Sequence, residues 1–129
     1  QKHRDLTEKT MLKFASERRL PVLGICRGMQ MLAVNDGSEL KKVVGHVNTV
    51  NTLKGEINGK VNSYHQYSIQ ACPESYSVTA RSNDGEIEAI RHKTLPWEGW
   101  MWHPERDSVI KKSFTDRFKK LIAKREPKP

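Results

Sequence analysis

The chain has 129 residues, enough for one domain with a hydrophobic core and too few for two ordinary domains. Its hydrophobic share is 36%, and no window approaches the roughly 18 continuous apolar residues of a membrane span. The first ten residues hold no apolar signal core, and the two cysteines, Cys26 and Cys72, lack metal-ligand pairing. We therefore expect a soluble protein of the reducing cytoplasm that does not partner a membrane.

The net charge of +8 at pH 7 could attract nucleic acid, an anionic membrane or a phosphorylated substrate. Much of this excess lies in residues 111–129. The apolar residues of that segment recur at helical spacing, and they are Phe114, Phe118, Leu121 and Ile122. A solvated cationic helix packed by one apolar stripe is the favoured interpretation, and a nucleic-acid-binding helix is the alternative.

The first third of the chain predicts a helix, a strand and a second helix. Residues 5–19 form an amphipathic pattern that ends before Pro21. The side chains expected to face a core are Leu6, Met11, Leu12, Phe14 and Ala15. Residues 22–26 form a short apolar run typical of a buried parallel strand, and residues 27–35 have helical character. This order predicts an α/β domain with a parallel sheet and crossover helices.

From residue 46 onward, short β-branched runs alternate with Gly, Asn and Asp, which predicts strands and hairpins. The predicted strands lie within residues 46–53, 56–64, 76–80 and 87–92. The stretch LPWEGWMWHPERD predicts a further strand that ends at a proline-containing loop. Its tryptophans are expected to pack in the core, because large aromatic side chains dominate cores. One domain is expected over residues 1–126, with a disordered tail at 127–129.

The stretch VLGICRGMQ places Cys26 at the join of a predicted strand and helix. A helix N-terminus favours an anion, so we expect the Cys26 thiolate to be stabilised there. Gly24 and Gly28 flank the cysteine, and we expect that a tight turn of this kind leaves no room for a Cβ at either position. The backbone N–H of Arg27 would then supply one half of an oxyanion hole. An ordinary buried cysteine is the alternative.

A nucleophilic cysteine needs a base and a group that orients the base. His103 and Glu105 can supply both. Pro104 biases His103 toward extended geometry, in which residues two apart point the same way. The sequence therefore predicts a Cys26, His103 and Glu105 triad.

These motifs give the chain a specific resemblance to the class I glutamine amidotransferase superfamily, and to its γ-glutamyl hydrolase branch in particular. The segments that carry it, in the branch's order, are RDLTE, VLGICRGMQML, VNSYHQYSI, SNDGEIEAI and MWHPER. The resemblance implies a flavodoxin-like α/β fold with a nucleophile elbow, a sharp strand-to-helix turn that exposes the nucleophile. It also implies that Cys26 attacks glutamine or a γ-glutamyl amide, that His103 transfers the proton and that Glu105 orients His103.

The resemblance also implies a γ-glutamyl pocket. Gln30 would contact the substrate, with a polar residue on an exposed helix face as the alternative. Ser63, Tyr64 and His65 would lie near the α-amino and carboxylate groups of the substrate, and His65 could equally be a structural histidine. The remaining histidines have no partner pattern and are expected to be structural or on the surface: His3, His46 and His92.

Family members have an N-terminal portion, with a second oxyanion donor, that precedes the segment matched by this chain. The resemblance therefore implies that the chain is weakly active or inactive unless a partner chain supplies that portion. Within the branch, RHKTLPWEGWMWHPERD is most similar to small bacterial members that hydrolyse nucleotide-linked γ-glutamyl phosphoramidates in surface-polysaccharide pathways. A glutaminase that passes ammonia to a partner synthase and a non-catalytic binding module are the alternatives. No metal-ligand spacing or phosphate loop is present in the sequence, so no cofactor is expected.

Overall fold

The computed structural model describes residues 2–124, and describes the side chains of residues 6–124. The disordered tail predicted at residues 127–129 lies outside this range, as does the side chain of His3. The elements in chain order are α1 (Lys2–Arg18), β1 (Val22–Ile25), α2 (Arg27–Asn35), β2 (Leu40–Lys42), β3 (Val47–Gly55), β4 (Gly59–Tyr64), β5 (Tyr67–Ile69), β6 (Tyr76–Ser82), β7 (Ile87–His92), β8 (Trp97–Trp100), a 3₁₀ turn (Pro104–Arg106) and α3 (Lys112–Ala123).

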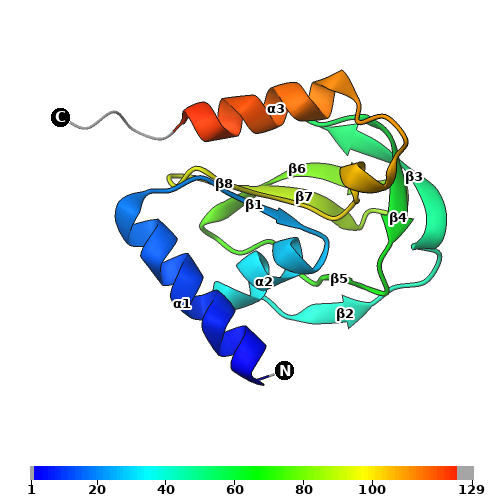
Figure 1. Cartoon of the computed structure of the whole chain (residues 1–129). Helices are drawn as coiled ribbons and strands as arrows, with labels where there is room; N and C mark the ends of the chain where they lie inside the picture. The colour runs from blue at the N-terminus through cyan, green and yellow to red at the C-terminus, as the bar shows by residue number, and fades with distance from the viewer. Residues whose placement is uncertain (1, 125–129) are drawn as a thin grey trace.

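A six-stranded mixed sheet forms the centre of the molecule, with strand order β1-β8-β7-β6-β3-β4 (Figure 1). Among the described strands, β1 and β8 are the one parallel pair, and the remaining pairs are antiparallel. The α/β class is therefore confirmed, and the parallel part of this segment is limited to one pair. Strands β2 and β5, which the sequence analysis did not predict, form a separate antiparallel pair.

Two hydrophobic layers cover the two faces of this sheet. On one face, α2 contributes Met29 and Leu32 to a core that also contains Ile90. On the other face, Trp100 and Phe114 belong to a second core. Figure 1 shows α3 over one side of the sheet, with α1, α2 and the β2–β5 pair on the opposite side. The sheet thus lies between the two layers, as expected for an α/β domain.

Helix α1 is longer than the predicted helix, and fewer of its apolar side chains are buried than predicted. Ala15 is buried and Leu12 packs against the core, as predicted. The prediction that Leu6, Met11 and Phe14 face a core is wrong, because all three side chains are exposed in this structure. The periodicity of α1 therefore identified a helix correctly but overestimated the surface that it buries. No helix of the described chain combines the length and apolar composition needed to cross a membrane.

Helix α3 packs through only part of the predicted apolar stripe. Phe114 and Leu121 are buried, as expected, whereas Phe118 and Ile122 are exposed. The rings of Trp100 and Trp102 stack with centroids 5.3 Å apart, and Phe114 lies within 5.6 Å of both. The third tryptophan is also buried, so the prediction that the tryptophans pack is confirmed.

Candidate active site

The parallel pairing of β1 and β8 brings the cysteine and histidine segments to the same edge of the sheet. Ile25 pairs with Trp100, so Cys26 directly follows one strand where Met101 follows the other. The Cys26 N–H donates to the Trp100 carbonyl at 2.7 Å, which holds the two strand ends together. His103 and Glu105 come from the chain that leaves β8. Segments far apart in the sequence therefore leave the sheet at the same edge, because parallel strands end at one edge.

Cys26 has the backbone geometry of a nucleophile elbow. Its φ of 53° and ψ of −104° lie outside the ordinary regions for a residue with a Cβ, and α2 begins at the next residue. Strain of this kind at a candidate nucleophile is typical of functional sites. A Cβ on Gly24 would lie 2.6 Å from the Gly28 backbone, so the strand must have glycine there for α2 to fold back over it.

Two findings modify the predicted role of the glycines. A Cβ on Gly28 would meet nothing within 4 Å, so the prediction that this position leaves no room is wrong. The second glycine that permits the close approach is Gly99 on β8, which pairs with Gly24. A Cβ on Gly99 would lie 2.7 Å from the Met29 Cγ. The sequence analysis missed Gly99 because its role depends on a helix far earlier in the chain.

The electrostatics of Cys26 differ from the expectation. Burial raises the pKa of the Cys26 thiol, and this effect exceeds the lowering by a hydrogen bond from the Arg27 N–H and by the Arg106 guanidinium. The prediction of a favoured thiolate is therefore wrong for this structure, although the Arg27 N–H does point at the sulfur as predicted. The negative charge of Glu105 also raises the pKa of the Cys26 thiol, so the carboxylate lies near enough to affect it. The thiol thus needs a base to become a nucleophile.

His103 and Glu105 form the predicted pair. The His103 Nδ1 lies 2.5 Å from the Glu105 Oε2. His103 itself has φ of −110° and ψ of 87°, near the extended region that Pro104 favours. The chain does not stay extended as far as Glu105, because Pro104–Arg106 is a 3₁₀ turn, and it is this turn that places the carboxylate next to the ring. Burial, the largest single effect, would raise the pKa of Glu105. The hydrogen bond from His103, a backbone hydrogen bond and the nearby charge of Arg106 together outweigh burial, and the pKa is lowered. With Nδ1 bound to a carboxylate, Nε2 is the nitrogen that can serve a thiol.

Asn62 on β4 fixes the backbone of His103. Its Nδ2 donates to the His103 carbonyl at 2.7 Å, and its Oδ1 accepts from the His103 N–H at 2.8 Å. The same Nδ2 donates to the Asp107 carboxylate at 3.0 Å. Sequence reasoning gave no role to Asn62, although it lies within the segment VNSYHQYSI, because an asparagine there carries no catalytic signature of its own.

Tyr64 lies beside the histidine and is partly exposed. Its ring meets the His103 ring edge-on, with centroids 6.1 Å apart. The Arg106 guanidinium lies 4.5 Å from the centroid of the Tyr64 ring, within the range of a cation–π contact. Tyr64 therefore lies next to His103, and its expected place near the α-amino and carboxylate groups of the substrate stays a prediction.

The other residues expected to bind the substrate are held by hydrogen bonds or buried. The Gln30 Nε2 donates to the Tyr67 carbonyl at 3.1 Å, so this amide is held in place. Ser63 is fully buried and its hydroxyl donates to the His46 carbonyl at 2.7 Å. His65 is 3% exposed. The burial of His65 favours the alternative of a structural histidine.

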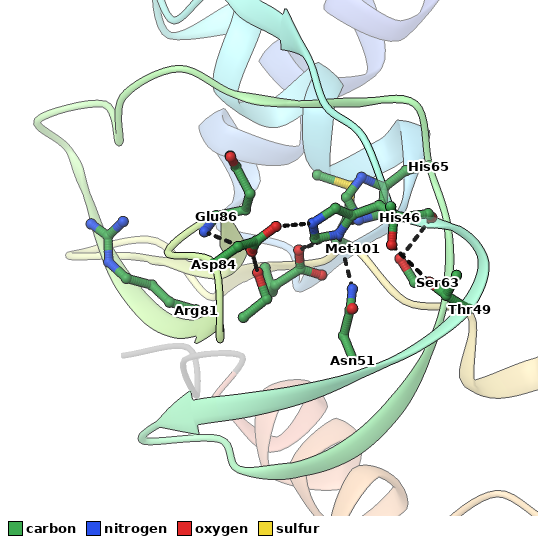
Figure 2. A network of polar contacts seen from close by, with 12 residues as sticks. His46, Thr49, Asn51, Ser63, His65, Arg81, Asp84, Glu86 and Met101 are labelled. Carbon is green, nitrogen blue, oxygen red and sulfur yellow. Dashed lines mark hydrogen bonds and ion pairs between the residues drawn. The ribbon is translucent and has the colours of Figure 1, made fainter.

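His65 joins a buried cluster with His46 and Glu88. Figure 2 shows His65 beside His46. These three residues lie in three separate segments, and no local spacing in the sequence could have indicated the cluster. His46 was expected to be structural or on the surface, and it is buried. His92 has a structural role, because its Nδ1 accepts the N–H groups of Thr94 and Leu95.

A hollow of about 250 Å³ lies next to the elbow. Its lining residues are Lys9, Arg27, Gln30, Met31, Val34 and Leu40. Lys9 and Arg27 are cationic, and Arg27 also pairs with Glu8 at 3.1 Å. An anionic group would be attracted to this rim.

Comparisons with known proteins agree on one family. The model of the class-I glutamine amidotransferases matches residues 4–120. The chain is 34% identical over 109 residues to a γ-glutamyl-CDP-amidate hydrolase of Campylobacter jejuni, covering 84% of this chain and 54% of that protein. It is 36% identical over 96 residues to one subunit of the glutamine-hydrolysing GMP synthase of Methanothrix thermoacetophila, covering 67% of this chain and 53% of that protein.

Solved structures support the same fold. A crystal structure described as a GMP synthase subunit of Thermoplasma acidophilum superposes with a TM-score of 0.73 at 22% identity, covering 86% of this chain and 60% of the other. The chain spans about half the length of the curated relatives that it matches. The family match, the elbow at Cys26 and the His103–Glu105 pair lead to one conclusion: this chain belongs to the class-I glutamine amidotransferase family.

Proposed function

We propose that this chain hydrolyses a γ-glutamyl amide bond through a thioester on Cys26 and releases glutamate. The observation that carries the proposal is the His103–Glu105 pair at the sheet edge where Cys26 occupies a strained elbow. A paired carboxylate fixes the tautomer of an imidazole and leaves its second nitrogen to act on a nucleophile. The similarity to a γ-glutamyl-CDP-amidate hydrolase supports the same reaction class.

In the first half-reaction, His103 Nε2 takes the proton of the Cys26 thiol as the sulfur attacks the γ-carbonyl carbon. The C–N bond then breaks, and the imidazolium returns the proton to the departing nitrogen. The Arg27 N–H, which already points at the sulfur, would donate to the developing oxyanion. A base is required for this step because burial keeps the pKa of the thiol above its ordinary value.

In the second half-reaction, His103 deprotonates a water molecule that attacks the thioester carbonyl. The C–S bond breaks, the thiol regains its proton and glutamate leaves. A nucleotide-linked γ-glutamyl phosphoramidate is the proposed substrate. The cationic rim formed by Lys9 and Arg27 next to Gln30, together with the net charge of +8, supports an anionic substrate.

A second function is favoured by the other relative. The GMP synthase subunit of Methanothrix thermoacetophila is glutamine-hydrolysing by name, and this chain matches about half of it. In this alternative, the same thioester chemistry at Cys26 acts on glutamine, and a partner synthase takes up the ammonia. The two functions share every residue of the triad and differ in the acceptor of the released nitrogen.

The proposal is tested first by trapping. The 129-residue chain is incubated with a glutamine-derived diazoketone, and the adduct is located by mass spectrometry. We expect labelling confined to Cys26, with Cys72 as the internal control, because the proposal gives a base and a γ-glutamyl pocket to Cys26 and neither to Cys72. Absence of labelling, or equal labelling of the two cysteines, would contradict the proposal and favour a non-catalytic binding module.

Turnover is then measured as glutamate release from glutamine and from a phosphate-bearing γ-glutamyl amide. Cys26→Ala should abolish release, and Cys72→Ala should leave it unchanged. Faster release from the phosphate-bearing amide supports the hydrolase, whereas faster release from glutamine supports the glutaminase. Release that survives Cys26→Ala would refute both.

A further inference from the structure

Three buried side chains bring their potential ligand atoms close together. His46, His65 and Glu88 are between 1% and 3% exposed, and their ligand atoms all lie within 4.8 Å of one another. They come from the segment before β3, the turn between β4 and β5, and β7. Figure 2 shows His46 with Asp84 and Asn51 around it and His65 beside it.

The outer hydrogen bonds fix which nitrogen of each ring carries the proton. The His65 Nδ1 lies 3.0 Å from the Tyr67 carbonyl, which can only accept, so Nδ1 is the protonated nitrogen. The His46 Nε2 lies 2.6 Å from the Asp84 carboxylate, and its Nδ1 accepts from the Asn51 amide at 2.9 Å. In the singly protonated form with these hydrogen bonds, each ring turns a lone pair toward Glu88, at Nε2 of His65 and at Nδ1 of His46.

Glu88 adds a third acceptor to these two. Its Oε2 lies 3.4 Å from the His65 Nε2 and 3.5 Å from the His46 Nδ1. Neither the His65 Nε2 nor the Glu88 Oε2 has a hydrogen-bond partner among the described residues, although both atoms are buried. Buried acceptors without a donor are costly, so a positive charge between them would remove a large penalty.

We propose that His46 Nδ1, His65 Nε2 and Glu88 Oε2 bind a divalent transition-metal ion, with Zn²⁺ as the best match. Two imidazoles and one carboxylate form a common zinc donor set. Zinc–ligand bonds of about 2.0 to 2.1 Å in a tetrahedron separate neighbouring ligands by about 3.3 to 3.4 Å. The two separations that involve Glu88 are close to this value, and a closer approach of the two rings completes the set.

The surroundings match the outer shell of a metal site. Metal-bound histidines usually donate their second N–H to a carboxylate or a backbone carbonyl, and Asp84 and Tyr67 hold these positions. The metal would displace the Asn51 N–H from His46. Because the Tyr67 carbonyl also accepts from Gln30, a bound ion would hold the β4–β5 turn against the helix that follows Cys26. The site is independent of the hydrolase activity proposed above.

The test measures metal content directly. The 129-residue chain, carrying no histidine tag, is incubated with Zn²⁺ and passed through metal-free buffer, and zinc is measured by mass spectrometry. We expect about one zinc per chain and, after Co²⁺ substitution, the visible absorption of a tetrahedral site. Glu88→Gln and His65→Ala should lose the metal, and Asp84→Asn should weaken its binding about 10-fold to 100-fold.

The control for other zinc ligands is the double variant Cys26→Ala and Cys72→Ala, which should retain the metal. Loss of zinc from this variant would place the ion on the thiols and overturn the proposal. So would a wild-type chain that retains none of the metals tested, in which case the cluster holds a proton. If the ligand variants do not fold, nitrogen NMR of the wild type decides. Zinc must then shift the His65 Nε2 and His46 Nδ1 signals, and unchanged signals overturn the proposal.

Discussion

Asn62 hydrogen-bonds to both backbone groups of His103, with its Nδ2 2.7 Å from the carbonyl oxygen and its Oδ1 2.8 Å from the nitrogen. These contacts connect β4 to the chain that leaves β8 and set the position of the imidazole. Asn62→Ala should therefore lower kcat about 10-fold to 100-fold with little change in KM, since small displacements of a catalytic group have effects of this size. Glutamate release gives both constants.

The matched control is Asn58→Ala, which changes an exposed asparagine on the same hairpin. It should leave kcat and the rate of Cys26 trapping unchanged. A rise in KM without loss of kcat in Asn62→Ala would show that Asn62 acts on substrate binding and not on the position of His103.

The raised pKa of Cys26 predicts its reactivity toward a reagent that does not use the γ-glutamyl pocket. The thiolate fraction is small at neutral pH because burial favours the neutral thiol, so alkylation by iodoacetamide should rise with pH and reach half its maximum above the ordinary thiol pKa. Burial also raises the pKa of Cys72, which should behave similarly. Peptide mass spectrometry across pH gives both profiles, and half-maximal alkylation of Cys26 near neutral pH would contradict the prediction.

Three glycines near the elbow should respond differently to alanine. Gly24→Ala forces a Cβ against the Gly28 backbone and should destabilise the fold by about 2 to 3 kcal/mol. Gly99→Ala meets the Met29 side chain, which can shift in part, and should cost about 1 to 2 kcal/mol. Gly28→Ala has open space within α2 and should be neutral or stabilise by up to about 1 kcal/mol. Urea unfolding ranks the three, and a destabilised Gly28→Ala would contradict this order.

Arg117 on α3 compensates a buried carboxylate. Its Nε lies 2.7 Å from Oε1 of Glu98, a residue on β8 whose side chain is 3% exposed, and its Nη2 lies 2.7 Å from Glu56. Arg117→Met would leave the buried Glu98 without its cation, and we expect a loss of about 3 kcal/mol in the free energy of unfolding.

The comparison for this variant is Lys112→Ala, which removes an exposed ion pair with Asp116 from the same helix. Exposed pairs contribute little, so its urea midpoint should equal that of the wild type. Equal effects of the two substitutions would show that Glu98 finds another partner when Arg117 is absent.

Local pattern predicted several elements well. The apolar run at 22–26 and the helical segment after it became β1 and α2, and residues 87–92 became β7. The short strands β2 and β5 were missed because three residues carry too little pattern, and their pairing is a long-range contact. In α1, the spacing of apolar residues predicted a face turned toward the core. The tertiary structure buries Ala15 of that face but leaves Phe14 exposed.

The sequence by itself determined the elbow around Cys26, the pairing of His103 with Glu105, and the family, because each rests on residues that are close together in the chain or in a fixed order. The tertiary structure alone decided the raised pKa of Cys26, the role of Asn62 and the convergence of His46 with Glu88. Burial and hydrogen-bond geometry depend on which strands, distant in the sequence, become neighbours in the sheet. The local sequence of a strand does not specify its neighbours.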